Sequence, residues 1–141
     1  MKEDFVGYDI AVKLKEKGFP QLKKNTLAMY NEDGEWFSLA RNLDTFEYLF
    51  DDFDDRDCVC PSIHQVLKWL RNTRKLFISP CVITDYQDDF HRDTTYWSFI
   101  VVNIESGDSI YREYERVTEK RYETYEEAAL AGIEYVINNL I

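Results

Sequence analysis

The segment that most constrains the fold is Thr95–Asn103, because its side chains are apolar on both faces of a predicted strand. A strand with this pattern is usually central in a sheet, since both of its faces need covering. We expect Leu76–Thr84 to be an edge or bulged strand interrupted at Pro80. Ser109–Val117 carries many charges, which predicts an exposed edge strand, and the order of the strands stays open. The apolar residues of the central segment are Tyr96, Trp97, Phe99, Ile100, Val101 and Val102.

Two helices flank this predicted sheet in the sequence, and each begins with a capping box. Ser62 with Gln65 and Thr124 with Glu127 place a hydroxyl three residues before a Glu or Gln side chain, the pattern that fixes a helix start. The helices should end near Arg74 and Leu140, and each has one apolar stripe to dock on the sheet. The sequence therefore predicts an α+β fold, with an antiparallel sheet packed against two or three helices. The stripes are Ile63, Val66, Leu67 and Leu70, and Ala129, Ile133, Val136 and Leu140.

The N-terminal third predicts a further helix and a hairpin. A helical pattern runs from Tyr8 to Lys17, and Gly18 suits the left-handed residue that commonly closes a helix. The Asp-Gly pair at 33–34 separates two apolar runs, at 26–30 and 35–40, which is a strong hairpin signal.

Length and composition favour one folded domain over residues 1–141. The chain is 45% hydrophobic and 16% aromatic, which argues against disorder. No apolar run approaches the roughly 18 residues of a membrane span. The first five residues include acids where a secretory signal has bases, so we expect a cytoplasmic protein without membrane contact. An odd count of three cysteines then suggests free thiols.

Charge is distributed unevenly along the chain. The formal net charge is −10, and residues 25–60 hold ten acids against Arg41 and Arg56. Residues 61–80 hold four bases and no acid. A negative field repels nucleic acid and anionic membrane, so we expect no direct nucleic-acid binding.

Three of these bases, Lys68, Arg71 and Lys75, form together with His64 one predicted surface, the basic helix face. Their spacing of i, i+4, i+7 and i+11 places them on one side of a helix. This face is a candidate site for a partner protein or an anion. The alternative, which is the commoner case for a charged helix side, is a solvated face that also offsets the acidic segment before it.

Residues 43–57 interleave acids with aromatic residues and predict a short helix or turn followed by a solvated acidic loop. Its acids are a second candidate partner surface. Together with the acids of 85–93 they suggest another function, a DNA mimic that occupies a host nucleic-acid-binding protein. An EF-hand is excluded because neither register of the segment contains the required glycine. The candidate acids are Asp51, Asp52, Asp54, Asp55 and Asp57.

Cysteine and histidine chemistry offers two weaker hypotheses. A zinc site would take its ligands from Cys58, Cys60, His64, Cys81 and His91. Only one closely spaced pair of cysteines is present, whereas zinc sites usually have two such pairs of ligands. The alternative is that the cysteines are small buried apolar residues. A nucleophilic Cys81 would need His91 and an acid such as Asp85 to orient it. The five glycines are scattered singly, which excludes phosphate loops. We expect no cofactor and no metal.

Three stretches together resemble a family of small uncharacterised proteins frequent in phages and mobile elements of gut bacteria. They are residues 11–19 (AVKLKEKGF), 61–71 (PSIHQVLKWLR) and 122–133 (YETYEEAALAGI). The resemblance implies a cytoplasmic, phage-linked setting and no catalytic residues. We therefore expect a non-enzymatic accessory protein that binds an unknown protein partner, as a monomer or closed homodimer. The DNA mimic and an enzyme of unknown type are the alternatives.

Overall fold

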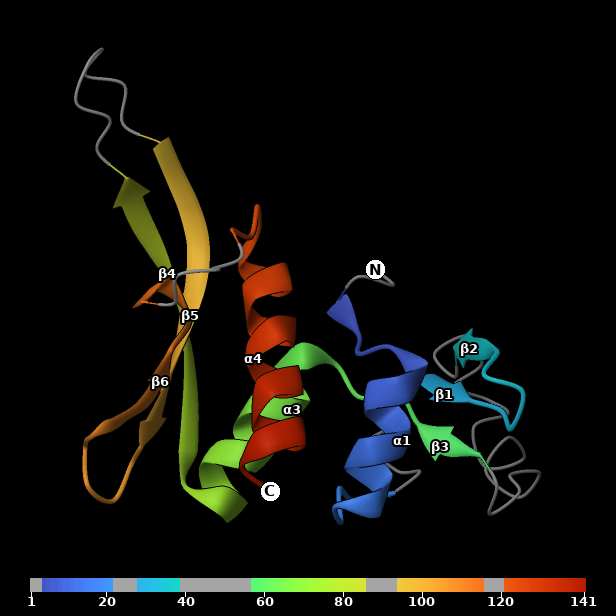
Figure 1. Cartoon of the computed structure of the whole chain (residues 1–141). Coiled ribbons are helices and arrows are strands. Elements are labelled where there is room, and N and C mark those ends of the chain that lie inside the picture. Colours follow the sequence, from blue (N-terminus) through green and yellow to red (C-terminus); the bar gives the residue numbers. More distant parts are fainter. Residues whose placement is uncertain (1–3, 22–27, 39–56, 86–93, 116–120) are drawn as a thin grey trace. The chain divides into compact units, whose positions relative to one another are not determined.

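The computed structural model describes residues 4–21, 28–38, 57–85, 94–115 and 121–141, which divide into two units (Figure 1). The first unit is Met1–Gln65 and the second is Val66–Ile141, so the boundary falls within helix α3 (Ile63–Trp69). Each unit combines helix with an antiparallel sheet, which confirms the predicted α+β class. The single-domain organisation stays a prediction.

Helix α1 (Tyr8–Glu16) of the first unit confirms the predicted N-terminal helix. It buries Ala11 and Leu14 completely and packs against strand β3 (Cys58–Val59). Gly18 follows with φ of +94°, a backbone conformation that side chains disfavour and that lets the chain leave the helix. The amide of Phe19 then donates to the carbonyl of Leu14 over 2.9 Å and completes the cap.

The predicted hairpin is also present, with β1 (Ala28–Tyr30) antiparallel to β2 (Trp36–Ser38). The side-chain Oδ1 of Asn31 fixes its loop by accepting from the amides of Asp33 (3.0 Å) and Glu35 (2.9 Å). Gly34 has φ of +81° and lies against the ring of Tyr8. Strand β3 pairs with the other edge of β1, so the small sheet has the order β2-β1-β3.

The second unit is built on a sheet of order β4-β5-β6. Strands β4 (Leu76–Asp85) and β5 (Thr94–Asn103) pair without a break, from Leu76 opposite Asn103 to Asp85 opposite Thr94. Pro80 therefore does not interrupt the strand, because β4 is the edge strand, where a missing N–H can face away from the ladder. The predicted central position of residues 95–103 is confirmed.

Helix α4 (Tyr125–Asn139) packs against β4 and β5 (Figure 1). Its start is fixed as expected, because Thr124 Oγ1 accepts from the amide of Glu127 over 3.1 Å. Gly132 is the contact point with the sheet, since a Cβ there would collide with Ile78 and crowd Phe99. The core of this layer consists of Ile78, Phe99 and Val101 from the sheet and Ala128, Ala129, Ile133, Val136 and Ile137 from the helix.

Burial differs from the sequence expectation at three places. Phe99 and Val101 are buried, whereas Trp97 on the same face and Ile100 and Val102 on the opposite face of β5 are only half-buried. Leu67 is only half-buried, while Val66 and Leu70 of the same stripe are fully buried. Leu140 is likewise half-buried, because it is the C-cap of α4 rather than a residue of its inner turns.

The predicted edge strand at Ser109–Val117 is shorter than expected. Strand β6 covers Ser109–Arg112, and a 3-10 turn, η5 (Glu113–Glu115), follows it. The pairing of β5 with β6 shifts register between Val101 and Val102. Pairing continues on both sides of this bulge, but the extra residue on β6 changes which side chains beyond it face inward. Glu113, expected to be exposed, is therefore turned inward and is only 8% exposed.

Candidate functional site

The basic helix face lies on α3 and on the π-helical turn η4 (Leu70–Arg74) that continues it. The predicted capping box starts α3: the Ser62 amide donates to Gln65 Oε1 over 2.9 Å, and the Gln65 amide donates to Ser62 Oγ over 3.2 Å. This reciprocal pair sets the helix start, and therefore sets which side chains face outward.

All four residues of the basic helix face, His64, Lys68, Arg71 and Lys75, are exposed. His64 and Lys68 lie one turn apart on α3, as the spacing predicts. The change to π geometry at Leu70 breaks the α-helical period, so Lys75 lies beyond the helix. Lys75 is the left-handed C-cap with φ of +57°, and it remains exposed there. The face is thus a helical row of three bases with a fourth at the helix end.

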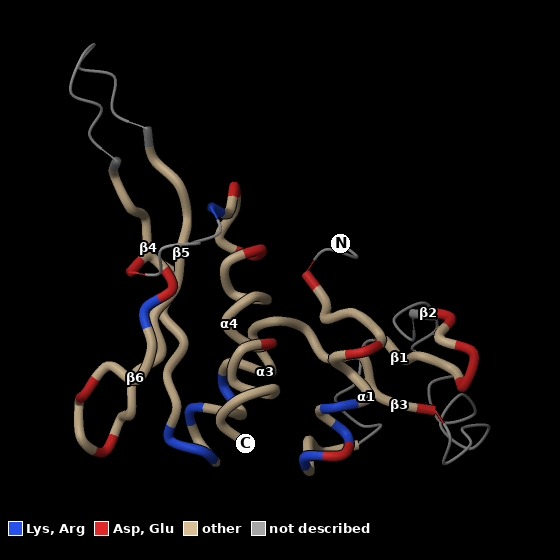
Figure 2. Tube along the Cα trace, in the orientation of Figure 1, with Lys and Arg blue, Asp and Glu red and all other residues tan. Residues whose placement is uncertain are grey.

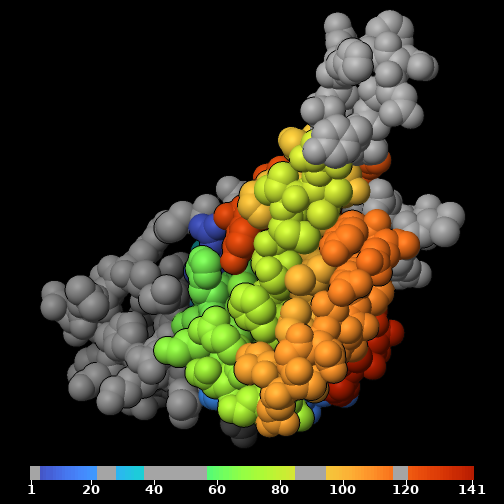
Figure 3. All heavy atoms as spheres, turned by 90° about the vertical axis from the view of Figure 1, so that its left-hand side faces the viewer, coloured from blue at the N-terminus to red at the C-terminus, as the bar shows by residue number. Residues whose placement is uncertain are grey.

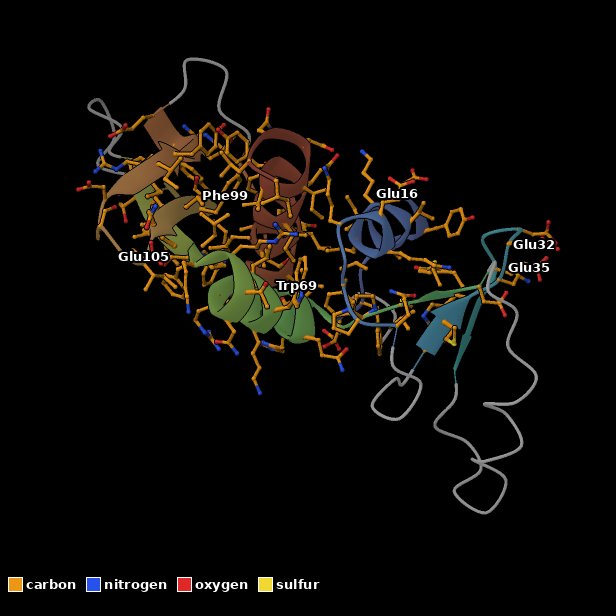
Figure 4. All side chains as sticks on the ribbon, turned by 90° about the horizontal axis from the view of Figure 1, so that it is seen from below. Glu16, Glu32, Glu35, Trp69, Phe99 and Glu105 are labelled. Carbon is orange, nitrogen blue, oxygen red and sulfur yellow. The ribbon has the colours of Figure 1, made fainter. Side chains whose placement is uncertain are left out.

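Two further contacts order the end of this helix. The Thr73 hydroxyl donates to the carbonyl of Trp69 over 2.6 Å. The Arg74 guanidinium lies over the Trp69 ring, 5.6 Å from its centroid, in a cation–π arrangement. Figure 4 shows Trp69 on α3 and nitrogen-tipped side chains extending from this helix away from α4. Trp69 and Arg74 therefore belong to the same surface.

The second candidate, the acidic partner surface, falls almost entirely outside the described residues. Asp51, Asp52, Asp54 and Asp55 lie there, as do most of the acids of 85–93. Asp57 is described and is half-buried. Its backbone carbonyl accepts from Lys15 Nζ over 2.8 Å, so this residue is tied to α1.

The cysteines lie mostly in the core. Cys58 and Cys60 are 2% and 1% exposed, and Cys60 Sγ donates to the carbonyl of Val6 over 3.5 Å. Burial raises the pKa of the Cys58 thiol; the nearby Lys15 charge opposes this and Asp57 reinforces it. The predicted small apolar role is confirmed for Cys60, whereas Cys81 is partly exposed.

Cys81 does not have the properties of an activated nucleophile. Burial raises the pKa of its thiol, which disfavours the reactive thiolate. His91 lies outside the described residues, so the geometry of the proposed Cys–His–acid set does too. Within the described part of the chain, no three Cys, His, Asp or Glu side chains lie close enough together to hold a metal ion.

Sequence reasoning missed a cluster of tyrosines around the inward-turned Glu113. The Tyr111 hydroxyl donates to Glu113 Oε2, and the Tyr111 ring stacks on Tyr135 of α4 with centroids 3.7 Å apart. Phe99 contacts the rings of Tyr111, Tyr122 and Tyr135. Burial, and then the charge of Glu113, raise the pKa of Tyr122 to about 12. The cluster joins α4 to the sheet, and its tyrosines come from three separate parts of the chain, so no local sequence pattern indicated it.

Comparisons of the chain with protein-family models, with curated proteins and with solved structures find no match. No helix in the described ranges is long and apolar enough to cross a membrane. The geometry of the basic helix face is therefore the basis on which we assign a function.

Proposed function

We propose that this chain is a non-enzymatic, cytoplasmic accessory protein, encoded by a phage or mobile element, that binds another protein through its basic helix face. One observation carries the proposal: an exposed basic face lies on a chain of net charge −10. No acid occurs in residues 61–80, so the charges of the face are not neutralised by acids of the same segment.

The face has the composition of a protein-binding surface. Arg and Trp are enriched among the residues that dominate binding energies, and Arg71, Arg74 and Trp69 lie together here. Arg74 already lies on the Trp69 ring, so part of the surface is ordered before any partner binds. Figure 2 shows the Lys and Arg positions of α3 and η4 gathered at one end of the second unit.

The charge distribution indicates an acidic surface on the partner. A basic face attracts acidic groups and speeds their encounter, while the net charge of −10 disfavours their approach to the chain as a whole. Like-charge repulsion elsewhere selects one binding orientation, which is a source of specificity. The alternative DNA mimic rests on acids outside the described residues, and no described contact favours it.

Affinity capture from bacterial host lysate, read by mass spectrometry, tests the proposal. The wild-type chain and a double variant, Lys68→Glu with Arg71→Glu, are compared. We expect a protein with an acidic surface that the wild type retains and the double variant loses. The matched control is Lys13→Glu, a charge reversal at an exposed site on α1. Equal capture by the wild type and the double variant would contradict the proposal.

A further inference from the structure

The larger sheet has an apolar face that points away from α4. Ile78, Phe99 and Val101 lie on the inner face against α4, and side chains alternate along a strand, so their neighbours form the opposite side, which we call the outer sheet face. Its large apolar side chains are Phe77 and Ile83 on β4 and Tyr96, Ile100 and Val102 on β5, and all of them are at least partly exposed. Figure 3 looks onto this face and shows β4, β5 and β6 at the surface. A contiguous apolar face of this kind marks an interaction surface.

One end of the outer sheet face adjoins the basic helix face. Phe77 is paired with Val102 across the two strands. The Ile104 amide donates to the carbonyl of Lys75 over 3.0 Å, so Ile104 lies beside the residue that ends the basic helix face. Phe77 and Ile104 are 40% and 44% exposed and Val102 is half-buried, and we call these three residues the apolar strip. The basic helix face and the apolar strip therefore meet at Lys75 and form one continuous surface.

The positive charge next to the apolar strip is concentrated on η4. Arg71 and Arg74 are exposed there, and residues 61–80 contain no acid. Lys75 contributes less, because the exposed Glu105 lies on the turn between β5 and β6 beside it (Figure 2). Asp108 adds a second exposed acid to that turn. A partner that carries acids should therefore place them on η4, since the acids of the turn repel them.

From this arrangement we infer that the partner of the basic helix face binds through an acidic amphipathic helix, with its acids on Arg71 and Arg74 and its apolar side over the apolar strip. The inference rests on the proposed function and specifies the binding element of the partner. One helix can carry acids and apolar residues on adjoining rows, and a sheet face is commonly covered by a helix, as α4 covers the inner face here. An acidic surface without apolar residues would leave the strip exposed, and the net charge of −10 repels an anionic membrane.

Fluorescence anisotropy with labelled synthetic peptides and the full chain tests the chemistry of the partner. The probe is an amphipathic peptide of about 18 residues with leucines on one side and glutamates beside them. One control peptide has lysines in place of the glutamates, and another has serines in place of the leucines. The wild type should bind the probe at least about tenfold more tightly than either control peptide. Equal binding of the three peptides, or no binding of the probe, overturns the inference.

The same titration with chain variants tests the apolar strip. Phe77→Ser should raise the dissociation constant of the probe about tenfold, because it removes the most exposed ring of the strip without changing the charge. Val82→Ser is the matched control, since Val82 is 53% exposed and lies on the other face of β4. Circular dichroism of both variants confirms that they are folded. A dissociation constant that Phe77→Ser leaves unchanged overturns the inference.

Lysate capture with Phe77→Ser separates this inference from the proposed function. The variant is run beside the wild type and the double variant Lys68→Glu with Arg71→Glu. Loss of the partner from both, together with the peptide result, supports the inference. If Phe77→Ser retains the partner that the double variant loses, the proposed function stands and the inference is overturned. If the double variant retains the partner, the proposed function fails and the inference that rests on it fails too.

Discussion

A Cβ atom added to Gly132 of α4 would lie 2.5 Å from Cγ2 of Ile78 on β4. Real carbon atoms do not approach so closely without displacement, so the absence of a side chain at Gly132 sets the distance between helix and sheet. The same added atom would lie 3.2 Å from the ring of Phe99, which is also tight. The packing of α4 on the larger sheet therefore depends on this glycine.

Gly132→Ala should destabilise the protein. Alanine gains about 1 kcal/mol in helix propensity over glycine, but overpacking a core contact costs typically about 1–3 kcal/mol. We expect a net loss of up to about 2 kcal/mol in the free energy of unfolding, measured by urea denaturation.

The variant Ile78→Ala tests whether contact with Ile78 causes the destabilisation expected for Gly132→Ala. It removes the Cγ2 atom, so adding Gly132→Ala to it should cost less than the same change costs in the wild type. The difference is the coupling energy of a double-mutant cycle. Equal costs in both backgrounds would show that Gly132 does not contact Ile78.

Leu70→Ala should destabilise the protein by roughly 2–5 kcal/mol, the range for a leucine without solvent exposure. Lys68→Ala, at an exposed position of the same helix, should change the free energy of unfolding by less than about 0.5 kcal/mol. The half-buried Leu67 should give an intermediate value on truncation. Denaturant midpoints of the three variants test this order. Equal midpoints would mean that the helix is rotated about its axis and that a different side of it faces the core.

Thr124→Ala should cost about 1 kcal/mol, because the Glu127 amide loses the oxygen that caps the start of α4. Thr124→Ser keeps that oxygen and should retain most of the stability. Thermal unfolding of both variants provides the comparison. A serine variant as unstable as the alanine variant would show that the hydroxyl is not the important group.

The protein should lose stability at alkaline pH partly through Tyr122. Its pKa in the folded state is about 12, against 10.0 for an unperturbed tyrosine, so the folded state holds the phenol proton more tightly. The stabilisation is complete below pH 10 and is lost as pH rises toward 12. Tyr122→Phe should make the fall in the free energy of unfolding over this window shallower. An unchanged slope would contradict a shifted pKa at this residue.

The elements predicted correctly from the sequence are those whose ends are set by residues close to them in the chain. Ser62 with Gln65 and Thr124 with Glu127 fix helix starts within a few residues, and the structure contains both hydrogen-bonded caps. Gly18 ends α1 for an equally local reason, its positive φ. The central position of residues 95–103 also followed from the sequence, because this segment is apolar on both faces, and the structure places it between β4 and β6.

The errors have long-range causes. The inward turn of Glu113 depends on a register shift between β5 and β6 that no local pattern encodes. The rotation that buries Leu70 more deeply than Leu67 depends on what the helix packs against. For the candidate site, the exposed bases were predictable from their spacing. The π-helical turn that moves Lys75 off the helix was not.

Photo-crosslinking in host cells tests the proposed function most directly. A photoreactive amino acid replaces Lys68 in the basic helix face in one chain and Thr84, an exposed residue of β4, in another. Our account predicts a discrete heavier adduct with one partner protein from the Lys68 position and no such adduct from the Thr84 position. Adducts from the Thr84 position alone, or none from the Lys68 position, would contradict binding through this face.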